Sequence, residues 1–232
     1  MKEDNQYTLL FLCGGTGTRM GAETPKQFLN FMGKPVLVHT LERIERIDLI
    51  TNIVIVCAPK YQADIENMLS QYGITKPVRF ADAGQTRQAS VFSGLKEVHT
   101  ELMILHEAAR PLVKQEDFES FIQFPYKNAT FGSSIPYSVI RGHNSVEGIL
   151  DRSELINVQL PQKFETRLLR EAHEKALSEG VTFTEDAGMI ARYFPDVEVG
   201  ICRGPEYDIK LTTPIDMEIG AVLFEHYFKD KK

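Results

Sequence analysis

The sequence predicts a protein of the α/β class with a mostly parallel sheet and a small β-arm. Two observations support the sheet: short apolar runs alternate with longer amphipathic segments, and a glycine-rich turn directly follows the first apolar run. A third observation, a polar segment in the second half that glycines interrupt, predicts the arm. Strand and helix patterns that alternate in this way are typical of a parallel sheet with helices on both faces.

Hydrophobic periodicity predicts the elements of the first half. Three apolar runs indicate strands buried on both faces: residues 9–13 (LLFLC), 53–57 (IVIVC) and 102–105 (LMIL). Three segments between them have helical spacing: residues 35–47, 61–72 and 86–98. One face of the first helix is apolar, and Glu42, Arg43 and Glu45 are expected to point away from it. Ligands of such sheets bind at the carboxyl ends of the strands.

The second half is less regular. Residues 132–137 are a candidate strand, and residues 141–159, broken by Gly142 and Gly148, predict an excursion or β-arm. A helix is expected over residues 164–178, ended by Gly180. Capping patterns predict two further helix starts, at residues 184–186 (TED) and 213–216 (TPID).

The composition limits the partners. The chain has 232 residues and a net charge of −6, which fits one globular domain and argues against binding to nucleic acid or anionic membranes. No apolar stretch approaches the ~20 residues of a membrane helix, so a cytoplasmic protein is expected. The widely spaced Cys13, Cys57 and Cys202 predict buried thiols in a reducing compartment.

The first candidate site is the glycine-rich turn GGTGTR at residues 14–19. Glycines after a strand allow backbone N–H groups to approach and bind phosphate oxygens. The turn is not a Walker A loop, and Met20 stands where a dinucleotide-binding pattern has its third glycine. By themselves the glycines favour a tight surface turn, but Arg19 and Lys26 close to them indicate a phosphate clamp.

The combination GGxGxRM…PKQ…GKPVLxHT resembles the signature of cytidylyltransferases that activate sugar-alcohol phosphates. It is most similar to the 2-C-methyl-D-erythritol 4-phosphate cytidylyltransferases of isoprenoid synthesis, and almost as similar to the ribitol-5-phosphate cytidylyltransferases of teichoic acid synthesis. Further blocks follow in the family's order: GQTRQASV at 84–91, HEAARP at 106–111, DR at 151–152, PQ at 161–162 and IKLTTP at 209–214. The resemblance implies a Rossmann-like nucleotide-binding domain over residues 1–232.

The resemblance also implies roles for residues of this chain. Arg19, Lys26 and Lys210 match catalytic residues of the family, and Arg19 and Lys26 would stabilise charge on the α-phosphate and pyrophosphate. The residues implied in CTP binding are Cys13, Gly14, Gly15, Thr16, Gly17, Gly84, Gln85, Arg87, Ser90, Glu107 and Ala108. Those implied in binding the acceptor's phosphate are Arg110, Arg152, Leu160 and Lys210. Since the family's equivalent of Arg152 comes from a neighbouring subunit, a homodimer is implied, with residues 138–160 as its arm.

The implied reaction is attack by a phosphate monoester on the α-phosphorus of CTP, with release of pyrophosphate. The monoester is largely dianionic at neutral pH because its second pKa is about 6, so no general base is needed. Positioning and charge neutralisation are then the enzyme's main tasks. A zinc motif HExxH is absent because position 110 is Arg110, and we expect Mg²⁺ to be carried by CTP instead of by protein side chains.

Four places depart from the family pattern. Glu107 replaces an aspartate, Leu160 a threonine and Asp208 an asparagine, and residues 137–141 lack the usual Asp-Thr pair. Two of these changes fall in blocks that contact the acceptor in the family, so the acceptor half of the site looks altered while the CTP half looks intact. Methylerythritol phosphate leads as the acceptor, followed by ribitol phosphate or another alditol phosphate.

Two other functions are alternatives. A hexose-1-phosphate nucleotidyltransferase has a similar GGxGTR…PK loop, although the HEAARP and IKLTTP blocks argue against it. A catalytically silent CTP-binding module is the alternative of a different class. Preference for CTP over UTP, GTP or dTTP would distinguish a cytidylyltransferase from the hexose-1-phosphate enzyme. CTP binding without pyrophosphate release on any acceptor would indicate the silent module.

Overall fold

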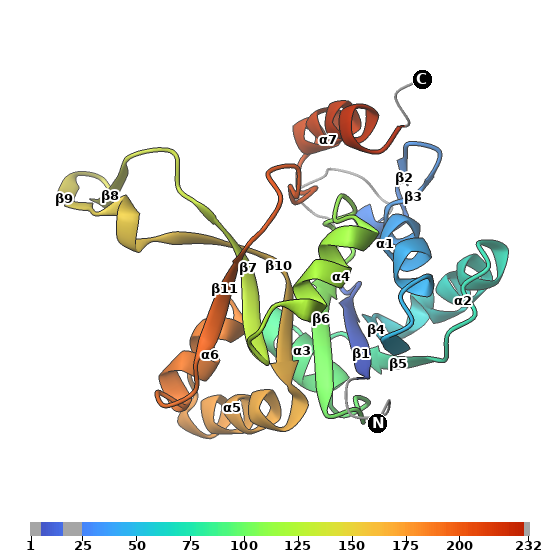
Figure 1. The fold of residues 1–232 in the computed structure, drawn as a ribbon, viewed down its shortest axis with the longest axis horizontal. Coiled ribbons are helices and arrows are strands. Elements are labelled where there is room, and N and C mark those ends of the chain that lie inside the picture. Colours follow the sequence, from blue (N-terminus) through green and yellow to red (C-terminus); the bar gives the residue numbers. More distant parts are fainter. Residues whose placement is uncertain (1–5, 16–24, 230–232) are drawn as a thin grey trace.

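The computed structural model describes residues 6–15 and 25–229. A seven-stranded sheet runs through the molecule in the order β11-β7-β10-β6-β1-β4-β5 (Figure 1). Strand β10 is antiparallel to both of its neighbours and the other pairs are parallel, which confirms the mostly parallel sheet. The strands are β1 (Tyr7–Leu12), β4 (Ile50–Cys57), β5 (Val78–Asp82), β6 (Leu102–Glu107), β7 (Asn128–Ser134), β10 (Ile156–Glu165) and β11 (Val199–Arg203).

Helices cover both faces of this sheet. On one face α1 (Val36–Glu45), α2 (Gln62–Gln71) and α4 (Gln115–Gln123) pack against a hydrophobic cluster that includes Leu9 and Phe11 of β1. On the other face α3 (Arg87–Leu95), α5 (Thr166–Glu179) and α6 (Asp186–Tyr193) pack against a cluster that includes Leu10. Alternate residues of β1 therefore enter different cores, as its continuous apolar run predicts.

A smaller cluster joins the C-terminal helix α7 (Pro214–Tyr227) to the hairpin of β2 (Asn30–Phe31) and β3 (Lys34–Pro35). The predicted start of α7 is confirmed: the Asp216 carboxylate accepts from the backbone N–H groups of Thr212 and Thr213, at 2.9 and 2.7 Å. Arg43 corrects the prediction for α1. Its guanidinium is partly buried and donates to the carbonyl oxygens of Pro111 and Val113.

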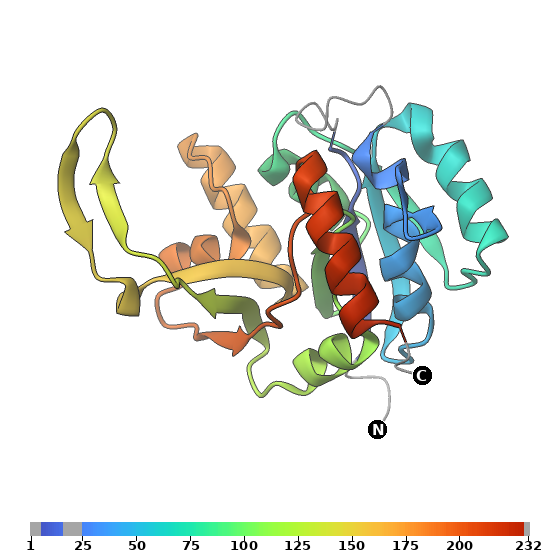
Figure 2. The same cartoon turned by 90° about the horizontal axis from the view of Figure 1, so that it is seen from above.

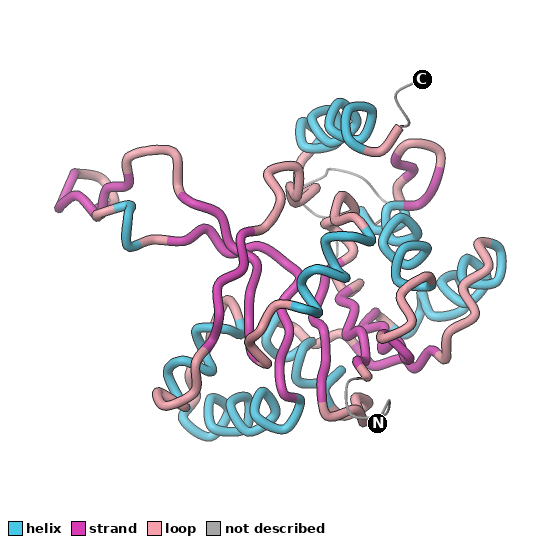
Figure 3. Tube along the Cα trace, in the orientation of Figure 1, coloured by secondary structure: helices cyan, strands magenta, loops and turns pink. Residues whose placement is uncertain are grey.

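The predicted β-arm is a hairpin of β8 (Val139–Gly142) and β9 (Val146–Leu150), followed by the short helix η4 (Arg152–Glu154). It extends away from the body of the molecule (Figure 1, Figure 2 and Figure 3). Its tip is separate from the main sheet, whereas residues 156–159 pair with β7 inside that sheet. The excursion is therefore shorter than the expected 138–160.

Two boundaries of the second half were wrong. The candidate strand at 132–137 is β7, which begins at Asn128 and ends at Ser134. The helix expected from residue 164 begins at Thr166, because Phe164 lies opposite Met103 in the β10–β6 ladder and is fully buried there. Among the residues that the structure describes, no helix is both long and apolar enough to cross a membrane.

Candidate active site

A cavity of about 420 Å³ opens at the carboxyl ends of β1 and β6, the edge of the sheet where the sequence predicts a ligand. It brings together much of the predicted site. Its lining contains Leu12, Cys13, Gly14, Gly15, Lys26, Gln27, Gly84, Gln85, Thr86, Arg87, Ser90, Glu107, Ala108, Ala109 and Lys210. The predicted Thr16, Gly17 and Arg19 lie outside the described residues.

Cys13, directly before Gly14 and Gly15, is held through both of its backbone groups. The Cys13 N–H donates to the Val56 carbonyl at 2.8 Å, and the Cys13 carbonyl accepts from Gln27 Nε2 at 2.7 Å. A Cβ on Gly14 would lie 2.6 Å from the Ala83 Cβ, so a side chain at this position displaces the neighbouring loop. Gln27 was not predicted as a site residue, although its position beside Lys26 in the PKQ motif was a usable signal.

Lys26 approaches the cavity from the short helix η2 (Lys26–Phe28). Its ammonium donates to the Leu211 carbonyl at 3.3 Å, in the segment that also carries Lys210. The PKQ motif and the IKLTTP motif, which are far apart in the sequence, therefore meet here. Each of them contributes a lysine to the cavity lining. This juxtaposition concentrates positive charge on one side of a glycine-lined wall.

Another part of the cavity lining is the start of α3 and the turn before it. The Ser90 hydroxyl accepts from the Gly84 N–H at 3.1 Å and donates to the Thr86 carbonyl at 3.0 Å. Thr86 caps the helix by accepting from the Ala89 N–H at 3.0 Å. A Cβ on Gly84 would lie 2.5 Å from the Ala89 Cβ, so this turn fits glycine alone. Gly84 and Ser90 are thus in direct contact where they line the cavity.

Glu107 is the carboxylate of the cavity, and two cations flank it. Its Oε2 lies 2.6 Å from Lys210 Nζ, and its Oε1 lies 3.0 Å from Arg110 Nε. Burial opposes ionisation of Glu107, but Lys210 and Arg110 outweigh it and lower the pKa of the carboxyl. Glu107 therefore holds both cations in place as an anion.

Arg110 also contacts Asp208, whose Oδ2 lies 3.1 Å from Arg110 Nη1. The Asp208 side chain is fully buried. Burial raises the pKa of Asp208 to about 7, although Arg110 acts in the opposite direction. Asp208 was noticed in the sequence only as a departure from the family pattern, and its pairing with Arg110 was missed.

Arg87 is the first residue of α3 and lines the cavity. Its Nη1 lies 2.5 Å from Oδ2 of Asp186, the first residue of α6. Burial lowers the pKa of Arg87, but the Asp186 carboxylate outweighs this and the net shift is upward. Asp186 was predicted as a first-turn acid of a helix and not as a partner of the site.

Three predicted acceptor residues lie outside the described cavity lining. Arg110 is engaged by Glu107 and Asp208, and the exposed Arg152 lies at the base of the arm, where it donates to the Pro136 carbonyl at 2.5 Å. Leu160 is a correction. Its side chain is only 5% exposed and packs in the same hydrophobic cluster as Leu10, so the side chain belongs to the core and not to the cavity lining.

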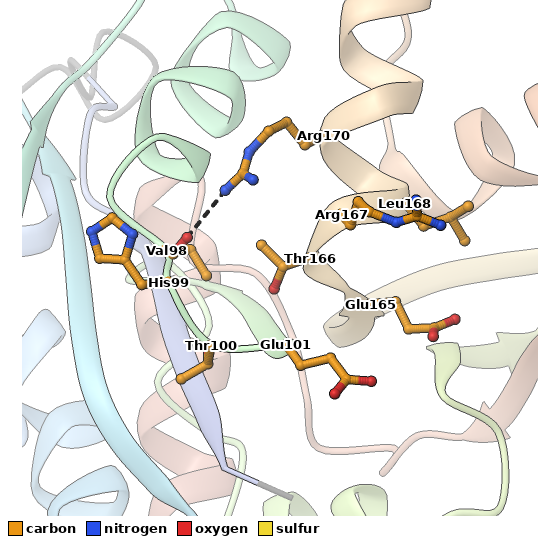
Figure 4. A pocket seen from close by; sticks show the side chains of 9 residues that line it. All are labelled: Val98, His99, Thr100, Glu101, Glu165, Thr166, Arg167, Leu168 and Arg170. Atoms are coloured by element: carbon orange, nitrogen blue, oxygen red, sulfur yellow. Dashed lines mark hydrogen bonds between the residues drawn. The ribbon is translucent and has the colours of Figure 1, made fainter. Parts of the chain in front are cut away.

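A second, larger cavity of about 640 Å³ lies near the amino end of β6 and the start of α5, whereas the first cavity lies at the carboxyl end of β6 (Figure 4). Its charged groups are of both signs. Arg170 donates to the carbonyl oxygens of Leu95 and Val98 at 2.9 and 3.1 Å, while Glu101 and Glu165 both pair with Lys127. Size alone therefore does not identify the site, since only the smaller cavity combines cations with a glycine-lined wall.

Within the described ranges, no group of three or more His, Cys, Asp or Glu side chains is placed to hold a metal ion. The carboxylate that lines the cavity, Glu107, is already paired with two cations. A nucleotide's own phosphate oxygens are the ordinary ligands of Mg²⁺ in such sites. The acidic side chain that lines the described cavity is thus engaged by the chain's own cations.

The fold and the cavity define an α/β nucleotide-binding protein. The family model described as IspD, 2-C-methyl-D-erythritol 4-phosphate cytidylyltransferase, matches residues 8–226. The chain belongs to this family, whose members are CTP-dependent cytidylyltransferases. The resemblance seen in the sequence is thereby confirmed.

Named relatives and solved structures agree with this assignment. The 2-C-methyl-D-erythritol 4-phosphate cytidylyltransferase of Geobacillus kaustophilus is 36% identical over 218 residues, 91% of this chain and 93% of that protein. The enzyme of the same name from Chlamydia caviae is 33% identical and covers 95% of this chain and 99% of its own. The 4-diphosphocytidyl-2C-methyl-D-erythritol synthase of Anaerococcus prevotii superposes with a TM-score of 0.83 at 25% identity, covering 96% of this chain and 98% of its own.

Proposed function

We propose that the protein transfers the cytidylyl group of CTP to 2-C-methyl-D-erythritol 4-phosphate and releases pyrophosphate. One observation carries the proposal: a glycine-lined cavity at the carboxyl edge of the sheet holds Lys26, Arg87 and Lys210 around one paired carboxylate. Such a cavity suits a polyphosphate and offers no nucleophilic side chain with an adjacent base among its described residues. The family membership supports the same reaction.

In this proposal the phosphate monoester of the acceptor attacks the α-phosphorus of CTP in line with the leaving pyrophosphate. The P–O bond to pyrophosphate breaks as the new P–O bond forms, and no proton has to move because the attacking phosphate is already largely dianionic. Catalysis then consists of holding the two phosphates together and neutralising the charge that builds on them.

Each part of the cavity has a proposed task. The backbone N–H groups of the glycine-rich turn, with Lys26 beside Gly15, bind the triphosphate. Gly84 and Ser90 form the surface for the cytosine base. Lys210, which Glu107 holds at the cavity, neutralises charge where the two substrates meet. Loss of one such contact typically costs on the order of 10²–10³ in rate.

We propose that Mg²⁺ binds as part of the nucleotide complex. Bound there, it screens charge between phosphate oxygens and helps to orient the triphosphate. The protein's own cations that would orient the triphosphate are Lys26, Arg87 and Lys210, which line the cavity. We also propose that the reaction takes place in the cytoplasm.

The arm supports a further proposal, a homodimer in which Arg152 serves the partner's site. The hairpin carries apolar side chains that are largely exposed, among them Ile140 at 57%, Val146 at 69% and Ile149 at 77%. Exposed apolar residues concentrated on a protruding hairpin are typical of an interface. Residues 1–232 would then form one nucleotidyltransferase domain with an appended arm.

The acceptor is assigned from the family membership. Leu160, one of the departures from the family pattern, lies in the hydrophobic core and is not among the residues that line the described cavity. Ribitol 5-phosphate is the competing acceptor. The two differ by one carbon in the chain and by a methyl branch, which the acceptor side of the site has to distinguish.

Pyrophosphate release with Mg²⁺ and CTP tests the proposal. We expect turnover with 2-C-methyl-D-erythritol 4-phosphate at a higher kcat/KM than with ribitol, glycerol or hexitol phosphates, and a preference for CTP over UTP, GTP and dTTP. Faster turnover of ribitol 5-phosphate would replace the acceptor and keep the reaction. CTP binding without turnover of any acceptor would contradict the enzyme and indicate a silent binding module.

A further inference from the structure

Behind the wall of the active-site cavity, three side chains from three helices form one continuous chain of contacts. Arg87 of α3 lines the cavity and pairs with Oδ2 of Asp186 on α6. The other oxygen of the same carboxylate, Oδ1, lies 2.9 Å from Nε2 of His173 on α5. The Asp186 and His173 side chains are each only 1% exposed, so solvent does not compete for these contacts.

The carboxylate between them is an anion. Burial raises the pKa of Asp186, but Arg87 and His173 outweigh it and the net shift is downward. Since an ionised carboxylate only accepts hydrogen bonds, Nε2 of His173 must carry a proton and donate it. Within the described part of the chain, the other ring nitrogen, Nδ1, is buried without a hydrogen-bond partner.

The imidazole ring is itself fixed in orientation. It stacks on Phe92 of α3 with 5.8 Å between ring centroids and an interplanar angle of 7°. A half-turn of the ring about its Cβ–Cγ bond would keep the ring plane but remove Nε2 from Asp186, and smaller rotations would tilt the ring away from Phe92. The ring therefore points its Nε2–H at one oxygen of Asp186 and leaves the other oxygen for Arg87.

We propose that His173 is a positioning residue for nucleotide binding, acting on Arg87 through Asp186. The proposal rests on the proposed function, because Arg87 acts on the nucleotide only if the cavity takes CTP. A guanidinium has five N–H donors, and Asp186 engages Nη1, which leaves other donors for the nucleotide. An arginine whose rotamer is already fixed loses less conformational entropy when the ligand binds.

The alternative is that His173 only joins α5 to α6. The two roles predict different losses. If the contact only joined the helices, its removal would lower the melting temperature and leave the affinity for CTP unchanged. If His173 positions Arg87, its removal weakens CTP binding, while the KM for the acceptor is unaffected because Arg87 is implied only in the nucleotide half of the site.

The variants His173→Leu and His173→Gln separate these roles. Leucine removes the donor, whereas glutamine keeps a side-chain N–H that can reach Asp186. Both have room, because His173 borders a cavity of about 320 Å³ between α3 and α5. The matched control is Ile190→Ala, which removes a fully buried side chain from α6, the helix of Asp186, and leaves Arg87, Asp186 and His173 themselves in place.

The measurement is the Kd of CTP with Mg²⁺ by isothermal titration, together with the KM for each substrate and the melting temperature. For His173→Leu we expect the Kd and KM of CTP to rise about tenfold, with kcat within about twofold, consistent with loss of one charge-assisted hydrogen bond. His173→Gln should recover most of the affinity. Ile190→Ala should lower the melting temperature and keep the Kd.

Two outcomes would overturn the proposal. One is an unchanged Kd in His173→Leu while the wild-type protein binds CTP. The other is an equal loss of affinity in Ile190→Ala, which would assign the effect to loosening of α6. Failure of the proposed function is a separate result, because in that case the wild-type protein itself binds no CTP.

Discussion

Glu107 Oε2 lies 2.6 Å from Lys210 Nζ, and this pair joins the end of β6 to the segment before α7 at the edge of the cavity. The same carboxylate contacts Arg110 through its other oxygen. One anion therefore sets the position of two cations that the family resemblance places around the acceptor's phosphate. The partly buried pairs also contribute to stability, which makes the arrangement testable without substrate.

Glu107→Gln should destabilise the folded protein by about 1–3 kcal/mol, because Lys210 and the largely buried Arg110 lose a negative charge. Chemical denaturation of both proteins measures the change. The matched control is Glu225→Gln, which breaks the exposed pair with Lys229 and should change stability by less than about 1 kcal/mol. Equal effects of the two variants would show that the Glu107 contacts add nothing.

Asp208→Asn should stabilise the protein in a pH-dependent way. The pKa of Asp208 rises from 3.8 to about 7 on burial, so over that range the folded protein holds a proton that the unfolded chain releases. Wild-type stability therefore falls as the pH increases from about 4 to about 7, by up to ~1.4 kcal/mol per pH unit from this group.

Asparagine does not titrate, so the stability difference between Asp208→Asn and the wild type should increase over the same pH range and then level off. Denaturation curves recorded from pH 4 to pH 8 measure this stability difference. The pH range extends beyond the Asp208 pKa of about 7, so that the levelling-off is observed. A difference that is constant with pH would contradict a buried, titrating Asp208.

Gly84→Ala should weaken CTP binding and cost about 1–3 kcal/mol of stability. The added Cβ would lie 2.5 Å from the Ala89 Cβ and 2.9 Å from the Ala89 carbonyl carbon, so the turn before α3 has to shift. Gly148→Ala is the control, since the nearest atom to its Cβ is Arg141 Nη2 at 3.8 Å. Titration with CTP and melting curves report both effects, and a Gly84→Ala protein with wild-type affinity would argue against this surface as the base site.

The arm can be tested by mixing two inactive proteins, Arg152→Ala and Lys26→Ala. If Arg152 serves the partner's site, mixed dimers contain one complete site, and random exchange at equal amounts restores about a quarter of wild-type activity. If Arg152 acts within its own chain, every site lacks one residue and the mixture stays inactive. A monomer in analytical ultracentrifugation would contradict the dimer directly.

Local sequence patterns predicted the elements that are locally encoded. Strands β1, β4 and β6 are continuous apolar runs, and the caps of α6 and α7 are short motifs, so each was placed near its observed position. Strand β10 was missed because it buries polar side chains. The Gln162 amide nitrogen donates to Thr130 Oγ1 and to Glu185 Oε2, both at 3.0 Å. The Lys163 ammonium donates to the carbonyl oxygens of Ile122 and Phe124. These partners are distant in sequence, so no pattern within the strand reveals them.

In the candidate site, too, local motifs were predictable from the sequence and contacts between distant residues were not. Glycine turns and neighbouring lysines identified the cavity lining, because a backbone that approaches phosphate requires these residue types in short motifs. The contacts that hold the lining in place were not predictable. Arg87 and its partner Asp186 are 99 residues apart, and Asp208 meets Arg110 across 98 residues. The fold alone brings such pairs together.

The most direct test of the account is formation of the cytidylyl product, followed by ³¹P NMR in a mixture of CTP, Mg²⁺ and 2-C-methyl-D-erythritol 4-phosphate. For the wild type we predict the coupled resonances of a new diphosphate diester together with pyrophosphate. For Lys26→Ala we predict a rate lower by roughly 10²–10³ at a similar melting temperature. A wild-type protein that forms no diphosphate product, or a Lys26→Ala variant that forms it at full rate, would contradict the account.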